Sequence, residues 1–266
     1  MHLHMTRALP RTNFHGSELI RCLADLRLAE DAESGNAFAE KLGLWIHFTD
    51  AVTLSAVHND SIAGSRKLQP EARCVARSAI GIEFDRIRAG LIDSIMKSCS
   101  PKLGRTHIAL PAPPFELPMD LAASYTPYRR FYDAHQCDMQ LSVYPLRVNA
   151  RDALAKASPR LKQLADLDAT FETILRERES KLLATVPVLL KKRFEQLFKA
   201  HQQMLVDTQQ ADNPAGWSQP GAWLARFCND MQTLLLAELE LRLQPTVGLT
   251  EALTGTSNND KREQDT

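Results

Sequence analysis

Residues 70–98 read PEARCVARSAIGIEFDRIRAGLIDSIMKS. Apolar residues recur in this stretch at spacings of three and four, which is the period of one face of a helix. Proline suits the first helical position, where no backbone N–H is needed. The stretch therefore predicts a long amphipathic helix, with an apolar stripe formed by Ala76, Ile80, Phe84, Ile87, Leu91 and Ile95.

The composition of the whole chain shows the same helical bias. Leu and Ala account for 37 and 32 of the 266 residues, whereas Val and Ile together account for 19. Because Leu and Ala favour helices and β-branched residues favour strands, the composition predicts an all-α fold. With 44% hydrophobic and 24% charged residues, the chain has the composition of a folded protein and not of a disordered one.

Charge, cysteine usage and hydropathy narrow the class of protein. The 32 Lys and Arg balance 32 Asp and Glu, which argues against binding polyanions by bulk electrostatics but leaves local basic patches open. The five cysteines form no short pair such as CxxC, so we expect free thiols and a cytoplasmic location. No apolar run reaches the roughly 20 residues of a membrane span, and the N-terminal residues lack a signal-peptide pattern.

The first part of the chain is predicted as a helical subdomain at residues 17–98, after a flexible lead at residues 1–16. Its apolar periodicity predicts helices at residues 17–30, 36–47, 49–59 and 70–98. Ser17 is placed to cap the first of these helices, because its hydroxyl can accept from a backbone N–H.

The rest of the chain is predicted as a proline-rich linker at 99–120, a helical bundle at 121–244 and a disordered polar tail at 245–266. Helices of the bundle are expected at residues 125–141, 146–157, 158–208 and 221–243. A straight helix over 158–208 would be about 75 Å long. Either it folds back at a kink at Pro187 or the bundle is elongated. We expect an elongated bundle, in which this helix packs antiparallel to those at 70–98 and 221–243.

An aromatic and basic stretch around residue 128 offers a candidate interaction surface. Arginines beside tyrosines can stack on the rings or contact phosphate, which would suit nucleic acid or another anion. However, Tyr128, Tyr132 and His135 share one helical face, so burial in the core is the favoured interpretation. The alternative is a surface formed by Tyr125, Tyr128, Arg129, Arg130, Tyr132, Lys191, Lys192 and Arg193.

Motifs for catalysis and metal binding do not occur in the sequence. It contains no HExxH, no zinc-type Cys and His spacing, and no GxxxxGK[ST], GxGxxG or GxSxG. We therefore predict no catalytic residue, no cofactor and no metal site. The pairs Glu238 and Glu240, and Asp166 and Asp168, lack the Glu-x-x-His of di-metal bundles and are interpreted as solvent-exposed charge.

Several segments together resemble a known family. They are RTNFHGSEL at 11–19, AFAEKL at 37–42, YRRFY at 128–132, LLATVP at 182–187 and RF at 193–194. They are similar to an uncharacterised bacterial family catalogued as domain of unknown function 3348. The resemblance implies genes located beside those for a proton-channel-like inner-membrane protein and an OmpA-like envelope protein. It therefore implies a cytoplasmic accessory of a membrane-spanning assembly.

Three functions are compatible with these observations. The favoured one is a non-enzymatic interaction or scaffold protein that binds protein partners in the cytoplasmic part of an inner-membrane complex, with self-association left open. The first alternative is a nucleic-acid-associated protein that uses Arg129, Arg130 and Lys191 to Arg193, which the balanced charge disfavours. The second alternative is an enzyme whose site carries no recognisable motif.

Overall fold

The computed structural model of the chain describes residues 17–26, 46–59, 70–100, 107–113 and 119–264. Within these ranges every regular element is helical, which confirms the all-α prediction. The elements are α1 (Glu18–Asp25), α3 (Phe48–Asn59), α4 (Pro70–Cys99), α5 (Leu121–Ala157), α6 (Pro159–Leu183), α7 (Val186–Thr208), the 3-10 turn η1 (Pro214–Gly216) and α8 (Trp223–Gln264). The helix predicted at 36–47 falls almost entirely outside the described residues.

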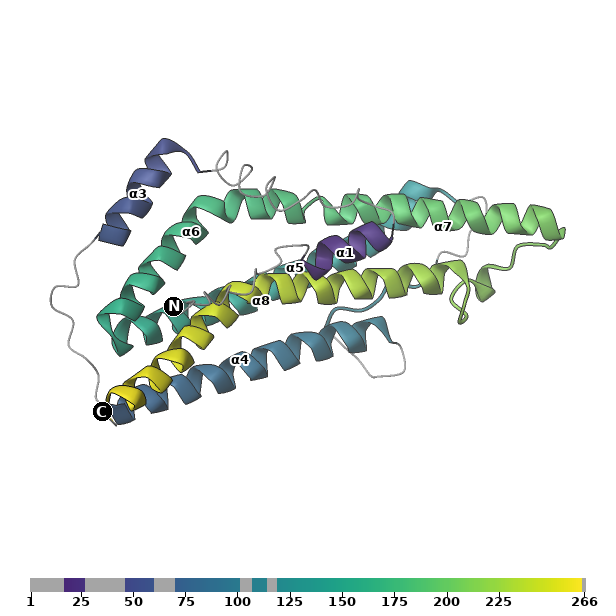
Figure 1. Cartoon of the computed structure of the whole chain (residues 1–266). Coiled ribbons are helices and arrows are strands. Elements are labelled where there is room, and N and C mark those ends of the chain that lie inside the picture. Colours follow the sequence, from purple (N-terminus) through teal and green to yellow (C-terminus); the bar gives the residue numbers. More distant parts are fainter. Residues whose placement is uncertain (1–16, 27–45, 60–69, 101–106, 114–118, 265–266) are drawn as a thin grey trace, which may run out of the picture.

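The long helices form an elongated antiparallel bundle, in which α6 and α7 together make one member (Figure 1). Helices α5 and α8 pack against each other, and both contact α4 on one side and α6 and α7 on the other. The expectation that the helix at 158–208 packs on the helix at 70–98 is therefore wrong. The central pair α5 and α8 separates these two members and fills the middle of the bundle.

The two short N-terminal helices lie on the outside of this bundle. Helix α1 packs on α8, and α3 packs on α6. The Ser17 hydroxyl accepts from the backbone N–H of Ile20 at 3.3 Å, which confirms the predicted cap. Leu19 and Leu23 of α1 belong to the same apolar cluster as residues of α4, α5, α7 and α8. Residues 17–98 and 121–244, predicted as separate units, thus share one core.

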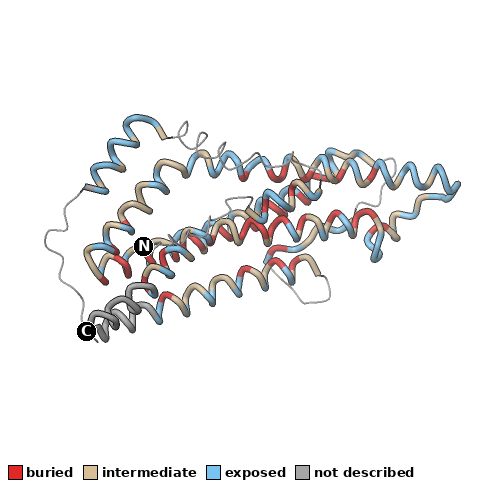
Figure 2. Tube along the Cα trace, viewed as in Figure 1, coloured by how far each residue is buried: buried red, intermediate tan, exposed pale blue. Residues whose placement is uncertain are grey.

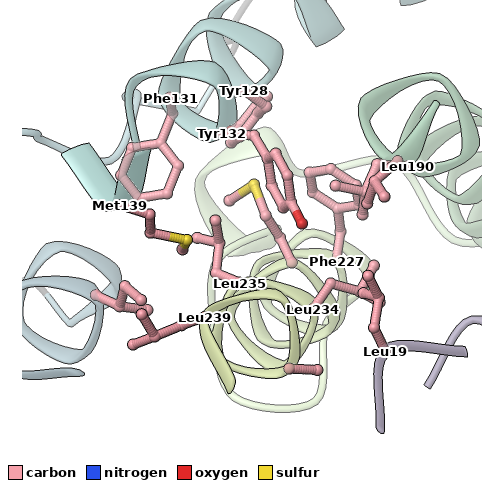
Figure 3. Packing of buried hydrophobic residues seen from close by; sticks show 14 of the residues in the cluster. Leu19, Tyr128, Phe131, Tyr132, Met139, Leu190, Phe227, Leu234, Leu235 and Leu239 are labelled. Atoms are coloured by element: carbon pink, nitrogen blue, oxygen red, sulfur yellow. The ribbon is translucent and has the colours of Figure 1, made fainter. Parts of the chain in front are cut away.

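Aromatic side chains fill the middle of the core. Figure 3 shows Tyr132 and Met139 of α5 beside Leu235 of α8 and Leu190 of α7. Around Phe194 of α7 the ring centroids of Tyr128 and Phe227 lie at 5.7 and 5.0 Å, in tilted and edge-on geometry. Burying a large apolar side chain contributes roughly 1.5–3 kcal/mol. This aromatic cluster is therefore a main source of the stability of the bundle.

Helix α5 is continuous, so the expectation of two helices at 125–141 and 146–157 is wrong. It contains both Pro127 and Pro145, which each remove one backbone donor. Both prolines lie on the exposed side of the helix, where water can reach the carbonyl group left without its N–H partner. The neighbouring Leu146 is fully buried and holds the helix in place across the second proline.

Helix α8 also runs further than the sequence suggests, and the predicted disordered tail at 245–266 is wrong for most of its length. The helix continues through Pro245 to Gln264 and is bent (Figure 1), as expected for a helix with an internal proline. Leu249 and Leu253 lie one turn apart and are buried in a second cluster with Ile80 and Leu154. This burial offsets the hydrogen bond lost at the proline.

The member of the bundle formed by α6 and α7, which we call the third member, is interrupted two residues before Pro187. It starts where the sequence predicts, at Pro159, and the Ser158 hydroxyl caps this start by accepting from the N–H of Leu161 at 3.2 Å. Helix α6 ends at Leu183, and α7 begins at Val186 after a short turn. Figure 1 shows α7 continuing away from α6 instead of folding back along it. The elongated alternative is therefore the one that the structure adopts.

The helical end of α8 can be tested with two neighbouring substitutions. Leu249→Ala should lower the free energy of unfolding by about 2–5 kcal/mol, because it leaves a cavity in the second cluster. Gly248→Ala should raise it by about 0.5–1 kcal/mol, because Gly248 is an exposed helical residue with open space for a methyl group. Urea denaturation followed by circular dichroism measures both. If neither value changes, this segment does not pack on the bundle.

Candidate functional site

The most unusual polar group of the structure is the carboxylate of Glu238, which is 0% exposed among the leucines of α8. It accepts from the Tyr132 hydroxyl at 2.9 Å, from Nε2 of Gln136 at 3.0 Å and from Nε of Arg242 at 2.9 Å. We call these four residues the Glu238 cluster. The interpretation of Glu238 as solvent-exposed charge is wrong, because these partners replace the water that a carboxylate loses on burial.

Two helices supply the Glu238 cluster, each with residues one turn apart. Tyr132 and Gln136 lie at i and i+4 on α5, and Glu238 and Arg242 lie at i and i+4 on α8. Burial and the neighbouring charge of Glu238 raise the pKa of Tyr132 well above its ordinary value, so the phenol keeps the proton that it donates. The cluster forms only when α5 and α8 pack together. The spacing of residues along one helix therefore could not predict it.

The Glu238 cluster extends to the break between α6 and α7. Nε2 of Gln136 also donates to the carbonyl oxygen of Leu183, at 3.2 Å. In an uninterrupted helix this oxygen would accept from residue 187, but Pro187 has no N–H. The hydroxyl of Tyr125 donates to the carbonyl oxygen of Pro187 on the other side of the break. Side chains of α5 therefore satisfy the backbone on both sides of the interruption.

The geometry of the Glu238 cluster is that of a closed structural site. Three side chains occupy both carboxylate oxygens, and Arg242 supplies a compensating positive charge at 2.7 Å. A general acid or base must reach the proton of a substrate. Because Glu238 is fully buried and already bonded, its chemistry here is to hold α5, α6 and α8 together.

A second polar site joins α5 to α6 and consists of Arg147, Arg151, Asp168 and Glu172. Asp168 accepts from Arg147 at 2.6 Å and from Arg151 at 2.7 Å, and Arg151 also pairs with Glu172. The interpretation of Asp168 as solvent-exposed charge is wrong, because its side chain is mostly buried between the two arginines. A sequence signal did exist: two arginines at i and i+4 come before the turn at Ser158, and two acids at i and i+4 come after it.

A third polar contact joins α4 to α5 inside the core. Nε2 of His135 lies 2.8 Å from Oγ of Ser98, whose hydroxyl donates to the carbonyl oxygen of Ile95 at 3.0 Å. Burial lowers the pKa of His135 to about 4, opposed by the charge of Asp138 and aided by His107. The imidazole is therefore neutral at physiological pH and serves as a buried hydrogen-bonding group.

The candidate surface around residue 128 divides into buried rings and exposed cations. Tyr125, Tyr128 and Tyr132 are all buried, which confirms the core interpretation for the rings. The structure does bring the two predicted stretches together, because Phe194, next to Arg193, contacts the rings of Tyr125 and Tyr128 at 5.7 Å. The tyrosines face this contact, so they cannot offer their rings to an external ligand.

The basic residues of the same candidate surface are partly neutralised by local partners. Arg129 lies 3.6 Å from Asp133, and Lys191 lies 4.0 Å from Glu195, both one turn along their own helix. Arg193 reaches Asp230 of α8 at 2.8 Å. Arg130 and Lys192 are exposed. An unbalanced basic stripe, as nucleic-acid binding requires, is not formed by these residues.

Comparisons with known proteins place the chain without describing its activity. The family model described as "Protein of unknown function (DUF3348)" matches residues 5–255. No curated protein and no solved structure matches the chain. In the described part of the chain, no three His, Cys, Asp or Glu side chains are grouped to hold a metal ion. Nor does any helix searched there combine the length and apolar character needed to cross a membrane.

Removing the central carboxylate tests the Glu238 cluster. Glu238→Ala should lower the free energy of unfolding by about 3–5 kcal/mol, because it leaves Arg242 as a buried charge without its partner. Glu240→Ala is the matched control on the same helix. Its partner Arg88 is well exposed, so the loss should stay below about 1 kcal/mol. Equal losses in the two variants, measured by urea denaturation, would contradict a special role for Glu238.

The depressed pKa of His135 predicts a pH dependence of stability. Between its folded pKa of about 4 and its ordinary value of 6.5, the unfolded chain binds more protons than the folded one. The contribution of His135 is therefore present above pH 6.5 and is lost as the pH falls toward 4. His135→Gln should make the thermal unfolding temperature less dependent on pH between pH 4 and 6.5. His58→Gln, on the exposed surface of α3, should leave the slope unchanged.

Proposed function

The chain belongs to the DUF3348 family, and we propose that it acts as a non-enzymatic interaction protein in the cytoplasm. The expected role is that of a scaffold, accessory to a membrane-spanning envelope assembly. The observation that supports it most directly is a pair of exposed apolar side chains on α3, Phe48 and Val52. Cys22, Cys99, Cys137 and Cys228 are free thiols, which is typical of a reducing compartment.

Helix α3 is an appendage of the bundle and not part of its core. It runs antiparallel to α6, because Gln163 donates to the carbonyl oxygen of His58 at one end and Arg178 lies 3.3 Å from His47 at the other. None of its described residues is buried (Figure 2). Leu54 and Val57 are half-buried, whereas Phe48 is 84% exposed and Val52 is 52% exposed.

An exposed aromatic next to an exposed aliphatic residue is a favourable anchor for a partner. Phe48 and Val52 lie one turn apart, so both side chains can enter the same groove of another protein. Burial of apolar surface contributes roughly 25 cal/mol per Å², and a few well-buried side chains carry most of the binding energy in protein interfaces. Because α3 is held mainly through α6, it can present these residues without disturbing the core.

The buried ionisable groups contact other helices of the bundle, and this favours an interaction protein over an enzyme. Glu238, Asp168 and His135 are the polar groups whose surroundings most resemble those of reactive residues, and each is engaged in a contact between helices. A catalytic role for any of these three groups would require it to be free for a substrate. The partner class, a cytoplasmic part of an inner-membrane complex, comes from the family resemblance.

Affinity purification of the full-length chain from native cells tests this proposal. Inner-membrane proteins should co-purify, and the double variant Phe48→Ser, Val52→Ser should reduce their recovery about tenfold or more, which corresponds to a loss of at least 1.4 kcal/mol. Ile82→Ser is the control, since Ile82 is 66% exposed on α4. Circular dichroism would confirm that all variants fold.

Three outcomes would contradict the proposal. The first is equal recovery with the α3 variant and the Ile82 control. The second is recovery of ribosomes or abundant cytosolic enzymes alone. The third is a salt-dependent mobility shift with short DNA or RNA, which would support the nucleic-acid alternative instead.

A further inference from the structure

The outer face of α5 carries a stripe of residues whose spacing is symmetric about Leu141. The stripe consists of Arg130, Ala134, Cys137, Leu141, Pro145, Val148 and Asp152. Successive members are four, three, four, four, three and four positions apart, so the order of spacings is the same from either end. Arg130, Cys137, Leu141, Pro145 and Asp152 are exposed, and Leu141 at the centre is 70% exposed. Ala134 and Val148 are half-buried, and Ala134 also packs against the main core cluster. We call this set the Leu141 stripe.

The Leu141 stripe lies opposite the buried face of α5. Tyr128, Tyr132, Met139 and Leu146 are nearly fully buried and face the rest of the bundle. At 100° per residue the Leu141 stripe occupies a band on the other side of the helix. Its middle is apolar, with Ala134, Cys137, Leu141, Pro145 and Val148, and its two ends are charged. The solvated face of an amphipathic helix typically carries charged and polar residues.

The two ends of the Leu141 stripe carry charges of opposite sign, and the two charged residues lie equally far from Leu141. Arg130 and Asp152 each lie eleven positions from Leu141, which is about 17 Å along the helix. Both are exposed, and neither takes part in an ion pair within the described parts of the chain. Two copies of α5 in antiparallel orientation would bring Arg130 of one copy opposite Asp152 of the other, twice.

We propose that the chain forms a homodimer in which the Leu141 stripes of two copies pack antiparallel, with the two-fold axis at Leu141. In this arrangement Leu141 meets its own copy, Ala134 meets Val148, and Cys137 meets Pro145. Such an interface is isologous, as in most dimers. A parallel pairing would place Arg130 against Arg130 and Asp152 against Asp152, so repulsion selects the antiparallel form. The inference does not rest on the proposed function.

Sedimentation equilibrium of the full chain at increasing concentration tests the dimer. The wild-type chain should associate to a dimer, and Leu141→Glu should abolish association because two carboxylates would meet at the axis. Val206→Glu is the matched control, since Val206 on α7 is also 70% exposed. It should leave association unchanged. A wild-type chain that stays monomeric, or an equal effect of the two variants, would overturn the proposal.

A charge exchange tests the orientation of the two copies. Arg130→Glu alone and Asp152→Arg alone should each raise the dissociation constant about tenfold or more, because each places like charges opposite one another twice. The double variant R130E/D152R should restore association, since the two charges have only changed places. Circular dichroism checks that each variant folds. If the double variant associates no better than the single ones, the antiparallel pairing is wrong.

Discussion

The arrangement of the bundle depends on one missing hydrogen-bond donor, the backbone nitrogen of Pro187. Because this residue cannot donate, the carbonyl oxygen of Leu183 needs another partner, and Gln136 of α5 provides it. The same amide binds Glu238 of α8, and Tyr125 of α5 binds the carbonyl oxygen of Pro187. Three members of the bundle are thus tied together where the third member is weakest. The interruption lets α6 and α7 follow the central pair as one long element.

This tie also sets the register of α5 against α6. Gln136 faces Leu183, and further along the hairpin Arg151 faces Asp168. The separation is the same on both helices, so the amide contact and the ion pairs belong to a single antiparallel alignment. A shift by one residue would turn both sets of partners away from each other. Polar groups buried between helices in this way give a bundle one alignment where apolar side chains alone would accept several.

Local sequence rules predicted the parts of the fold that depend on neighbouring residues. The cap at Ser17 and the buried stripe through Tyr128 and Tyr132 follow from spacing along a single helix. Glu238 was misread because its partners on α5, Tyr132 and Gln136, lie more than a hundred positions earlier, and a charge among leucines is usually exposed. The helices were predicted to end before Pro145 in α5 and before Pro245 in α8. Whether water or packing compensates for the missing donor at these prolines depends on tertiary contacts, which the sequence does not show.

The position of α8 in the chain has a consequence for how the protein is made. This helix supplies Phe227, Leu234 and Leu239, which lie at the centre of the core, yet it leaves the ribosome after every other described helix. Until α8 has been made, the apolar faces of α4, α5 and α7 that pack on it stay without their partner. Helix α1 docks on α8, so it cannot dock until every described helix between the two has been made. Nascent chains of this protein therefore expose hydrophobic helices for a long time, which is the condition in which chaperones bind.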